Sequence, residues 1–363
     1  GIVTYATNVY RDIELDSCTA GNKNRAREIV QKFHTIGSTN LYGGLLTGLH
    51  MAYQGGRRSR VLLFTDGHAN DGRWIDNDDI IREIVRETTA LASKTQSQVT
   101  LSTFGYLGEH DEFLLQHLAT NVGGGTYNFL NENTALSSAT AKVLGDAIHT
   151  VGEKIHLTIT PVDNVQIVEA IANFSSRQTG EKLTFEIPST ADQQSRHILL
   201  RLAVSPTRER AVHSSLYAVE LRYKNTLTER DEGSDEYLYV ARTENLDLGT
   251  RSREVDEQLN RIFVVRQIEF ALDVLKKEDR ENSVALLQKA CDKIERSDSK
   301  GHTLSVCLKE DLQQLMQEVK DGDLNTAKKS LQDSLTSHWQ EKGGRSSCYV
   351  TRKEDKLITL FTS

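Results

Sequence analysis

The hydrophobic pattern of the first 150 residues alternates short apolar runs with longer amphipathic stretches. Apolar runs of this length, bounded by turn residues, predict strands that are buried on both faces. We expect strands at residues 1–5, 60–65, 98–105 and 126–129, and helices near residues 22–36, 41–54, 78–93, 111–121 and 134–149. The alternation predicts a doubly wound, mostly parallel α/β sheet with helices on both faces.

From about residue 151 the pattern becomes rich in β-forming residues. The segments "KIHLTITPV", "KLTFEIPST", "HILLRLAVS" and "SLYAVELRY" follow one another without intervening helices. They predict an antiparallel β-sandwich over residues 151–248. We interpret the charged stretch "LTERDEGSDE", residues 227–236, as a hairpin loop between two of its strands.

The last part of the chain has apolar positions at helical spacing, as in "VDEQLNRIFVVRQIEFALDVL". This spacing predicts a helical bundle over residues 249–342, followed by a tail or strand over residues 343–363. Asp323 follows a glycine and precedes Leu324, which is the arrangement of a helix cap. The predicted domains are therefore residues 1–150, the sandwich, the bundle and the tail.

Charge and cysteine content exclude several classes of protein. Lys and Arg total 44 against 51 Asp and Glu, and no long basic block is present, which argues against a nucleic-acid partner. No stretch approaches the ~20 apolar residues of a membrane span. Cys18, Cys291, Cys307 and Cys348 show no C-x-x-C spacing. We expect reduced thiols and a cytoplasmic protein.

Asp66 is the first candidate for chemistry, because it ends the apolar run in "VLLFTDGHANDG". In an open parallel sheet, ligands bind beyond the carboxyl ends of the strands, where Asp66 is expected to lie. The alternative is that Asp66 and Gly67 form only a turn. A second candidate is "GSTNLYGGL", whose Ser38, Thr39 and Asn40 either cap a helix or reach a ligand.

Other motifs favour structural roles. His110 and His117 are seven residues apart, which is more typical of a solvated helix face than of a metal pair. The glycines of "NVGGGTY" lack the Gly-Lys-Ser/Thr ending of a phosphate loop, so we expect a tight turn. No nucleophile–base motif emerges around any Ser or Cys, and we predict a protein that is not an enzyme.

Four segments, in order, resemble a von Willebrand factor type A domain over residues 1–150: "GIVTYATNVY", "IGSTNLYGGLLTGL", "VLLFTDGHANDG" and "LSTFGYLGEHDEFLLQHLATNVGGGTYNFL". The resemblance implies a divalent ion, typically Mg²⁺, held by an Asp-x-Ser-x-Ser loop, a threonine and a further aspartate. It assigns the threonine to Thr39 and the aspartate to Asp66. It also implies an open coordination position for an Asp or Glu from a protein partner.

The Asp-x-Ser-x-Ser motif does not occur in this sequence. In the resembled family it precedes the strand that begins here at Gly1, so we expect a fragment whose first strand and metal loop lie upstream. Mg²⁺ binding is expected only together with that loop, which supplies most of the oxygen ligands.

We therefore predict a metal-ion-dependent protein-interaction module of the MIDAS type, with no catalysis of its own. One alternative is the substrate-binding part of a larger enzyme, since the domain order loosely resembles plant RING-type ubiquitin ligases of the wavy-growth family. No Cys/His RING pattern is present in the sequence. A further alternative is a secreted adhesion protein. Upstream sequence would distinguish the three.

Overall fold

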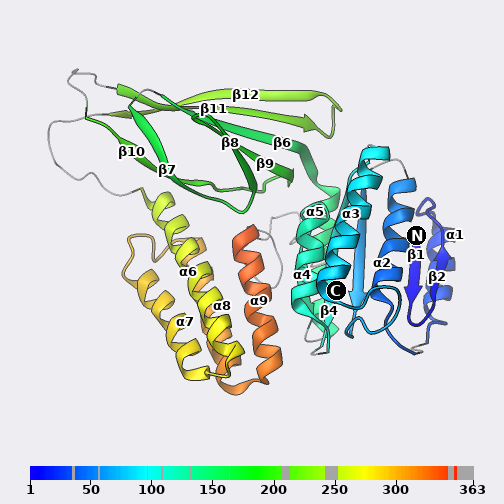
Figure 1. Ribbon diagram of the computed structural model, residues 1–363. Coiled ribbons are helices and arrows are strands. Elements are labelled where there is room, and N and C mark those ends of the chain that lie inside the picture. The colour runs from blue at the N-terminus through cyan, green and yellow to red at the C-terminus, as the bar shows by residue number, and fades with distance from the viewer. Residues whose placement is uncertain are drawn as a thin grey trace. The chain divides into compact units, whose positions relative to one another are not determined.

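The chain forms two compact units, Gly1–Ala139 with Gly322–Thr336, and Thr140–Asp321 with Ser337–Ser363. Figure 1 shows the computed structural model. The structure describes residues 1–34, 37–55, 58–95, 97–107, 109–130, 133–162, 164–206, 213–241, 252–341 and 347–349. Each unit is discontinuous along the sequence, because part of the last helix belongs to the first unit.

The first unit contains a parallel sheet with the strand order β3-β4-β5. Its strands are β3 (Ser59–Thr65), β4 (Val99–Tyr106) and β5 (Tyr127–Leu130). The predicted parallel α/β fold is thus confirmed. The central strand β4 is buried along most of its length, as expected. In β3, however, the side chain of Phe64 is 44% exposed, although its ring stacks on that of the buried Phe104.

An antiparallel hairpin precedes the parallel sheet and consists of β1 (Ile2–Tyr5) and β2 (Val9–Ile13). The hydrophobic pattern predicted only the first of these strands. β2 carries a charged pair in its middle and therefore lacks an apolar run. Asp12 on β2 accepts a hydrogen bond from the backbone N–H of Thr4, at 3.0 Å, which compensates its polarity within the hairpin.

Five helices accompany these strands: α1 (Ala20–Val30), α2 (Leu41–Gln54), α3 (Asn77–Thr95), α4 (Glu112–Asn121) and α5 (Asn133–Ile148). Helix α2 packs against β3 and β4, helix α4 packs against β4 and β5, and α3 contacts both helices (Figure 1). Leucine and isoleucine side chains from these elements form one buried core, which includes Leu45, Leu49, Ile84, Leu101 and Leu118. Each such side chain contributes about 1.5–3 kcal/mol through burial.

The second unit contains two antiparallel sheets, as predicted. Their strands are β6 (Thr150–Pro161), β7 (Val165–Ile171), β8 (Ser175–Thr179), β9 (Lys182–Ala191), β10 (Leu199–Val204), β11 (His213–Asn225) and β12 (Asp231–Ala241). One sheet has the order β12-β11-β6-β9-β8, and β10 pairs with β7 in the other. Alternate residues of β9, such as Phe185 and Ile187, are buried, which is the period-2 pattern of a strand with one covered face.

The acidic stretch 227–236 is only partly a loop, so its interpretation as a hairpin loop is wrong from Asp231 onward. Residues from Asp231 form β12, the edge strand of the five-stranded sheet. Arg222 donates to Asp235 at 2.8 Å, and the hydroxyl of Tyr223 donates to Glu232 at 2.9 Å. These cross-strand partners, together with solvent, allow acidic residues in a strand.

The helical region after the sheets is also confirmed. It comprises α6 (Arg253–Lys276), α7 (Arg280–Glu295), α8 (Thr303–Asp321) and α9 (Leu324–Gln340), followed by the short 3-10 helix η1 (Ser347–Tyr349). Asp323 caps α9 as predicted, because its carboxylate accepts from the backbone N–H of Thr326 at 2.8 Å. Apart from η1, the predicted tail or strand at residues 343–363 lies outside the described residues.

The cysteines divide into two kinds. Cys18 and Cys291 are free, as expected, but Cys307 and Cys348 form a disulfide, so the prediction of four reduced thiols is wrong for this pair. The two partners are 41 residues apart in sequence, and no short spacing motif marks them. The expectation of a cytoplasmic protein, which used the thiols as its argument, loses that support. Within the described residues, every helix is too short or too polar to cross a membrane.

Candidate functional site

Asp66 lies at the carboxyl end of β3, and Thr39 lies in the loop that leads into α2. The helix itself begins at Leu41, where Asn40 is the cap: its side-chain oxygen accepts from the backbone N–H of Gly43 at 2.9 Å. Asn40 is therefore the residue that caps the helix, among the three candidates Ser38, Thr39 and Asn40. The hydroxyls of the other two residues remain available for other contacts.

Two hydrogen bonds between Thr39 and Asn70 hold the loop of Thr39 and the loop of Asp66 together. The N–H of Thr39 donates to the side-chain oxygen of Asn70 at 2.6 Å, and the N–H of Asn70 donates to the carbonyl of Thr39 at 3.1 Å. A Cβ atom added to Gly67 would lie 3.3 Å from the hydroxyl oxygen of Thr39. The structure thus places the Thr39 hydroxyl beside the residue that follows Asp66, and the Asp66 side chain is exposed.

Gly72 closes the second loop against the first. Its φ of +95° lies in the region that favours glycine, and a Cβ at this position would come within 2.1 Å of the side-chain oxygen of Asn40. The loop can approach the start of α2 so closely only because residue 72 has no side chain.

A second carboxylate, Asp71, belongs to the same edge and was not predicted from the sequence. The hydroxyl of Ser38 donates to it, and the hydroxyls of Ser38 and Thr7 lie 2.9 Å apart. The Ser38 hydrogen bond, followed by the backbone N–H of Gly72, lowers the pKa of Asp71 below its ordinary value. The signal in the sequence is the Asn-Asp-Gly of "GHANDG", a second aspartate in the segment that follows Asp66.

Tyr5 lies near enough to Asp66 to be influenced by its charge. Its hydroxyl donates to the carbonyl of Phe64 at 2.7 Å, which links β1 to β3. Burial, with a smaller contribution from the charge of Asp66, raises the pKa of Tyr5 to about 12. Tyr5 is therefore neutral at physiological pH and serves as a hydrogen-bond donor.

Comparison with known proteins matches residues 1–142 to the von Willebrand factor type A domain. This part of the chain is a von Willebrand factor type A domain. A curated relative, the uncharacterized protein YfbK of Escherichia coli K12, is 33% identical over 138 residues, which are 36% of this chain and 21% of that protein. The match thus spans about a fifth of the relative's length.

A solved structure, a von Willebrand factor type A protein from Catenulispora acidiphila, superposes with a TM-score of 0.63 at 15% identity. The superposition covers 93% of this chain and 79% of the other. At this level of identity the similarity concerns the fold. It extends beyond the von Willebrand factor type A domain, because it includes most of the sheets and helices of the second unit.

The donors at this edge of the von Willebrand factor type A domain fit a small hard cation. Thr39 and Asp66 offer a hydroxyl and a carboxylate oxygen, and Mg²⁺ prefers oxygen ligands while keeping several waters. The adjacent hydroxyl of Ser38 and carboxylate of Asp71 are oxygens as well.

The other sequence candidates lie elsewhere. His110 is fully buried in the loop before α4, so the interpretation as a solvated helix face is wrong for it. Its Nε2 lies 2.8 Å from the hydroxyl of Tyr127, and its backbone carbonyl accepts from Lys329 at 2.6 Å. His117 lies on α4 with its ring near that of Phe113. No local feature of the sequence indicates that a lysine of α9 reaches this loop.

The glycines of "NVGGGTY" form a turn between α4 and β5, as predicted. Gly123 and Gly124 have φ values of +72° and +66°. A Cβ on Gly125 would lie within 1.8 Å of the carbonyl oxygen of Leu101 on β4. These glycines therefore allow the chain to turn and pass close to the neighbouring strand.

Proposed function

We propose that the chain is a protein-interaction module in which a divalent ion, Mg²⁺ in the first place, bound at Thr39 and Asp66 accepts a carboxylate from a protein partner. Von Willebrand factor type A domains commonly mediate protein–protein interactions, and residues 1–142 form such a domain. The module has no catalysis of its own. Its partner contributes an Asp or Glu side chain to the ion.

The observation that carries the proposal is the approach of Thr39 to the loop of Asp66. The Thr39 hydroxyl lies 3.3 Å from the Cβ position of Gly67, and one backbone–backbone and one backbone–side-chain hydrogen bond join the loops. Asp66 is exposed, so a macromolecule has access to the ion. An oxygen donor set with open positions suits Mg²⁺, whose octahedral shell the Asp-x-Ser-x-Ser loop of the family, water and the partner would complete.

The attraction for an acidic partner is local to the ion. The chain has a formal net charge of -7, which opposes the long-range approach of a carboxylate. A bound divalent cation is the largest charge in its immediate surroundings and dominates there. Binding that depends on the ion is therefore expected to show little electrostatic steering.

The first test is metal binding by the full-length protein, followed by the electron paramagnetic resonance of Mn²⁺. Wild type should bind one Mn²⁺ that Mg²⁺ displaces, and Asp66→Ala should not. Asp71→Asn distinguishes the roles of the two carboxylates: this variant should still bind the ion if Asp66 is the ligand. Glu181→Ala, in the turn between β8 and β9, is a matched control with the same loss of charge. Equal binding by wild type and Asp66→Ala would refute the site.

The second test is partner capture with and without EDTA, after circular dichroism has shown that each variant is folded. Asp66→Ala should weaken capture by roughly 2–5 kcal/mol, the cost of removing one member of a buried charged contact. Chelation should have the same effect on wild type and none on Asp66→Ala. If neither Asp66→Ala nor EDTA changed partner binding, the interaction surface would have to lie elsewhere than at Thr39 and Asp66.

A further inference from the structure

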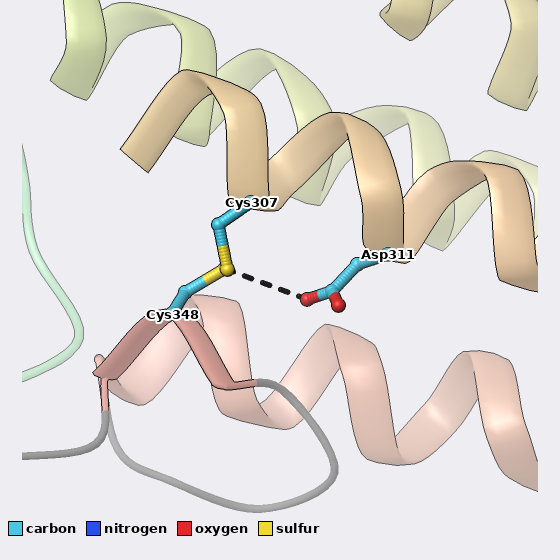
Figure 2. Close-up of side chains that lie close together, drawn as sticks. All are labelled: Cys307, Asp311 and Cys348. Atoms are coloured by element: carbon cyan, nitrogen blue, oxygen red, sulfur yellow. Dashed lines mark hydrogen bonds between the residues drawn. A yellow bond between two sulfur atoms is a disulfide. The ribbon is translucent and has the colours of Figure 1, made fainter. Parts of the chain in front are cut away.

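A second group of metal-ligating side chains lies in the other unit. Cys307 and Asp311 are four residues apart on α8 and so share one helix face. Cys348 comes from η1. The two sulfur atoms and a carboxylate oxygen of Asp311 all lie within 4.8 Å of one another (Figure 2). With His338 of α9, described next, these residues make up what we call the α8–α9 cluster.

His338 lies beside Asp311. Its side chain is fully buried, and its Nε2 lies 3.3 Å from the Oδ2 of Asp311. This Nε2 makes no hydrogen bond within the described residues. The other ring nitrogen, Nδ1, lies 3.0 Å from the hydroxyl of Tyr349. A ring held by a hydrogen bond at one nitrogen, with the other directed into a group of ligands, is the usual arrangement of a metal-bound histidine.

The disulfide accounts for the two sulfurs but not for their polar neighbours. The Sγ of Cys348 lies 3.5 Å from Oδ2 of Asp311 (Figure 2). A thiol can donate a hydrogen bond over this contact, whereas a disulfide sulfur has no proton to donate. A carboxylate and a buried imidazole beside the sulfurs therefore favour a state in which Cys307 and Cys348 are reduced.

We propose that Cys307, Asp311, His338 and Cys348 form a Zn²⁺ site in the reduced protein, and that the disulfide is its oxidised, metal-free form. Two thiolates, one imidazole and one carboxylate are ligands that Zn²⁺ takes in tetrahedral sites. Zinc–sulfur bonds of ~2.3 Å place two thiolates ~3.8 Å apart in such a site. The ligand atoms of Cys307, Asp311 and Cys348 lie within 4.8 Å of one another and need only small shifts to reach this geometry. His338 does not belong to this group of three, so its ring must turn from Asp311 toward the sulfurs to complete the site.

The change between the two forms is a thiol–disulfide exchange. One thiolate of a dithiol reductant attacks a sulfur of the disulfide, which breaks the Cys307–Cys348 bond and frees one cysteine. The second thiolate of the reductant attacks the mixed disulfide and frees the other cysteine, so that two electrons and two protons pass to Cys307 and Cys348. The reductant leaves as its own disulfide. Zn²⁺ then replaces the two thiol protons. A cavity of about 440 Å³, lined in part by Cys348, Tyr349, Glu341 and His302, leads to the cluster.

The first experiment uses Co²⁺ as a spectroscopic substitute for Zn²⁺. The reduced full chain, freed of reductant under anaerobic conditions, should bind one Co²⁺ with thiolate-to-cobalt charge transfer in the near ultraviolet, and Zn²⁺ should bleach this band. The oxidised chain should show none. Cys348→Ser should lose the band, whereas the matched control Cys291→Ser, a buried cysteine of α7, should keep it.

The remaining ligands are tested by Asp311→Asn and His338→Gln in the reduced protein. Each should weaken Zn²⁺ binding by at least the roughly 10- to 100-fold that loss of an outer-shell partner costs. Wild type offers an independent readout: Zn²⁺ should protect Cys307 and Cys348 from alkylation and leave Cys18 reactive, as mapped by mass spectrometry. A reduced wild type without a charge-transfer band, or without this selective protection, would overturn the proposal.

Discussion

The surroundings of His110 and of His338 can be compared directly, because the two histidines are equally buried and each has a tyrosine hydroxyl beside one ring nitrogen. Both side chains are fully buried, and each has one ring nitrogen about one hydrogen-bond length from a tyrosine hydroxyl, at 2.8 Å for His110 and 3.0 Å for His338. In each ring the other nitrogen makes no hydrogen bond within the described residues. The difference lies in what surrounds the second nitrogen.

Burial and a neighbouring cation oppose a positive charge on His110. Burial, followed by the charge of Lys329, lowers the pKa of His110 to about 4. His338 instead faces the carboxylate of Asp311, with two sulfurs beyond it. The comparison teaches that burial alone does not make a histidine structural or functional. The sign of the neighbouring charges and the softness of the neighbouring donors decide between a core residue and a ligand.

The largest expected effect comes from reducing the Cys307–Cys348 disulfide without supplying a metal. The second unit should lose about 4 kcal/mol of its free energy of unfolding, because the bond closes a long loop. Urea unfolding would be followed in Trp74→Phe, which leaves Trp339 as the reporter of the second unit, and in Trp339→Phe, which leaves Trp74 in the first. A similar loss in the free energy of unfolding reported by Trp74 would contradict the prediction that the disulfide stabilises the second unit in particular.

His110→Ala should have the next largest effect on stability. It removes a buried ring and leaves the hydroxyl of Tyr127 without this partner, so the first unit should be destabilised by about 3 kcal/mol, with or without Zn²⁺. His117→Ala on α4 is the matched control, and its effect should stay within about 0.5 kcal/mol. If Zn²⁺ changed the stability of His110→Ala but not of wild type, His110 would have to be counted among the ligands.

Acid should destabilise the first unit through His110. As pH falls, the unfolded chain takes up a proton near pH 6.5, but the folded chain only near pH 4, so the unfolded state gains stability between these values. The free energy of unfolding at Trp74 should fall by about 2 kcal/mol between pH 7.5 and pH 5. This component should be absent in His110→Gln. A loss of the same size in that variant would assign the effect to other groups.

The two tyrosine partners give the smallest effects and the sharpest contrast. Tyr127→Phe leaves Nε2 of His110 without its hydrogen bond and should cost about 1 kcal/mol of stability in the first unit. Tyr349→Phe should lower the Zn²⁺ affinity of the reduced protein, by roughly tenfold, through the loss of the group that orients His338. Cobalt spectra and urea curves of both variants would check this. If Tyr127→Phe lowered the Zn²⁺ affinity and Tyr349→Phe only the stability, the roles assigned to His110 and His338 would have to be reversed.

Local signals in the sequence predicted much of this fold. Helix α2 occupies residues 41–54 as expected, and Asp323 caps α9, because apolar spacing and capping chemistry act between residues a few positions apart. The parallel sheet was predicted from apolar runs that alternate with amphipathic stretches, and the change to antiparallel strands from β-rich segments without helices between them. The carboxyl edge of β3 also placed Asp66, since the end of an apolar run marks the end of its strand.

Contacts between distant residues could not be predicted in this way. The sequence around Cys307 and Cys348 carries no spacing that pairs them across 41 residues. His110 was misjudged because its burial depends on a tyrosine on the following strand and on Lys329 of α9. Asp71 was missed because its partner, Ser38, lies on another loop. In each case the missing information was tertiary.

The edge strand β12 bears on the behaviour of the protein in concentrated solution. One side of its backbone faces away from β11, and such an edge can recruit a strand from a second molecule. Its first half carries Asp231, Glu232, Asp235 and Glu236, so two molecules that approach edge to edge repel each other. The following stretch, Tyr237 to Val240, is apolar and exposed. Colloidal stability therefore depends on ionised carboxylates, and acid or high salt should promote sheet-to-sheet aggregation by weakening their repulsion.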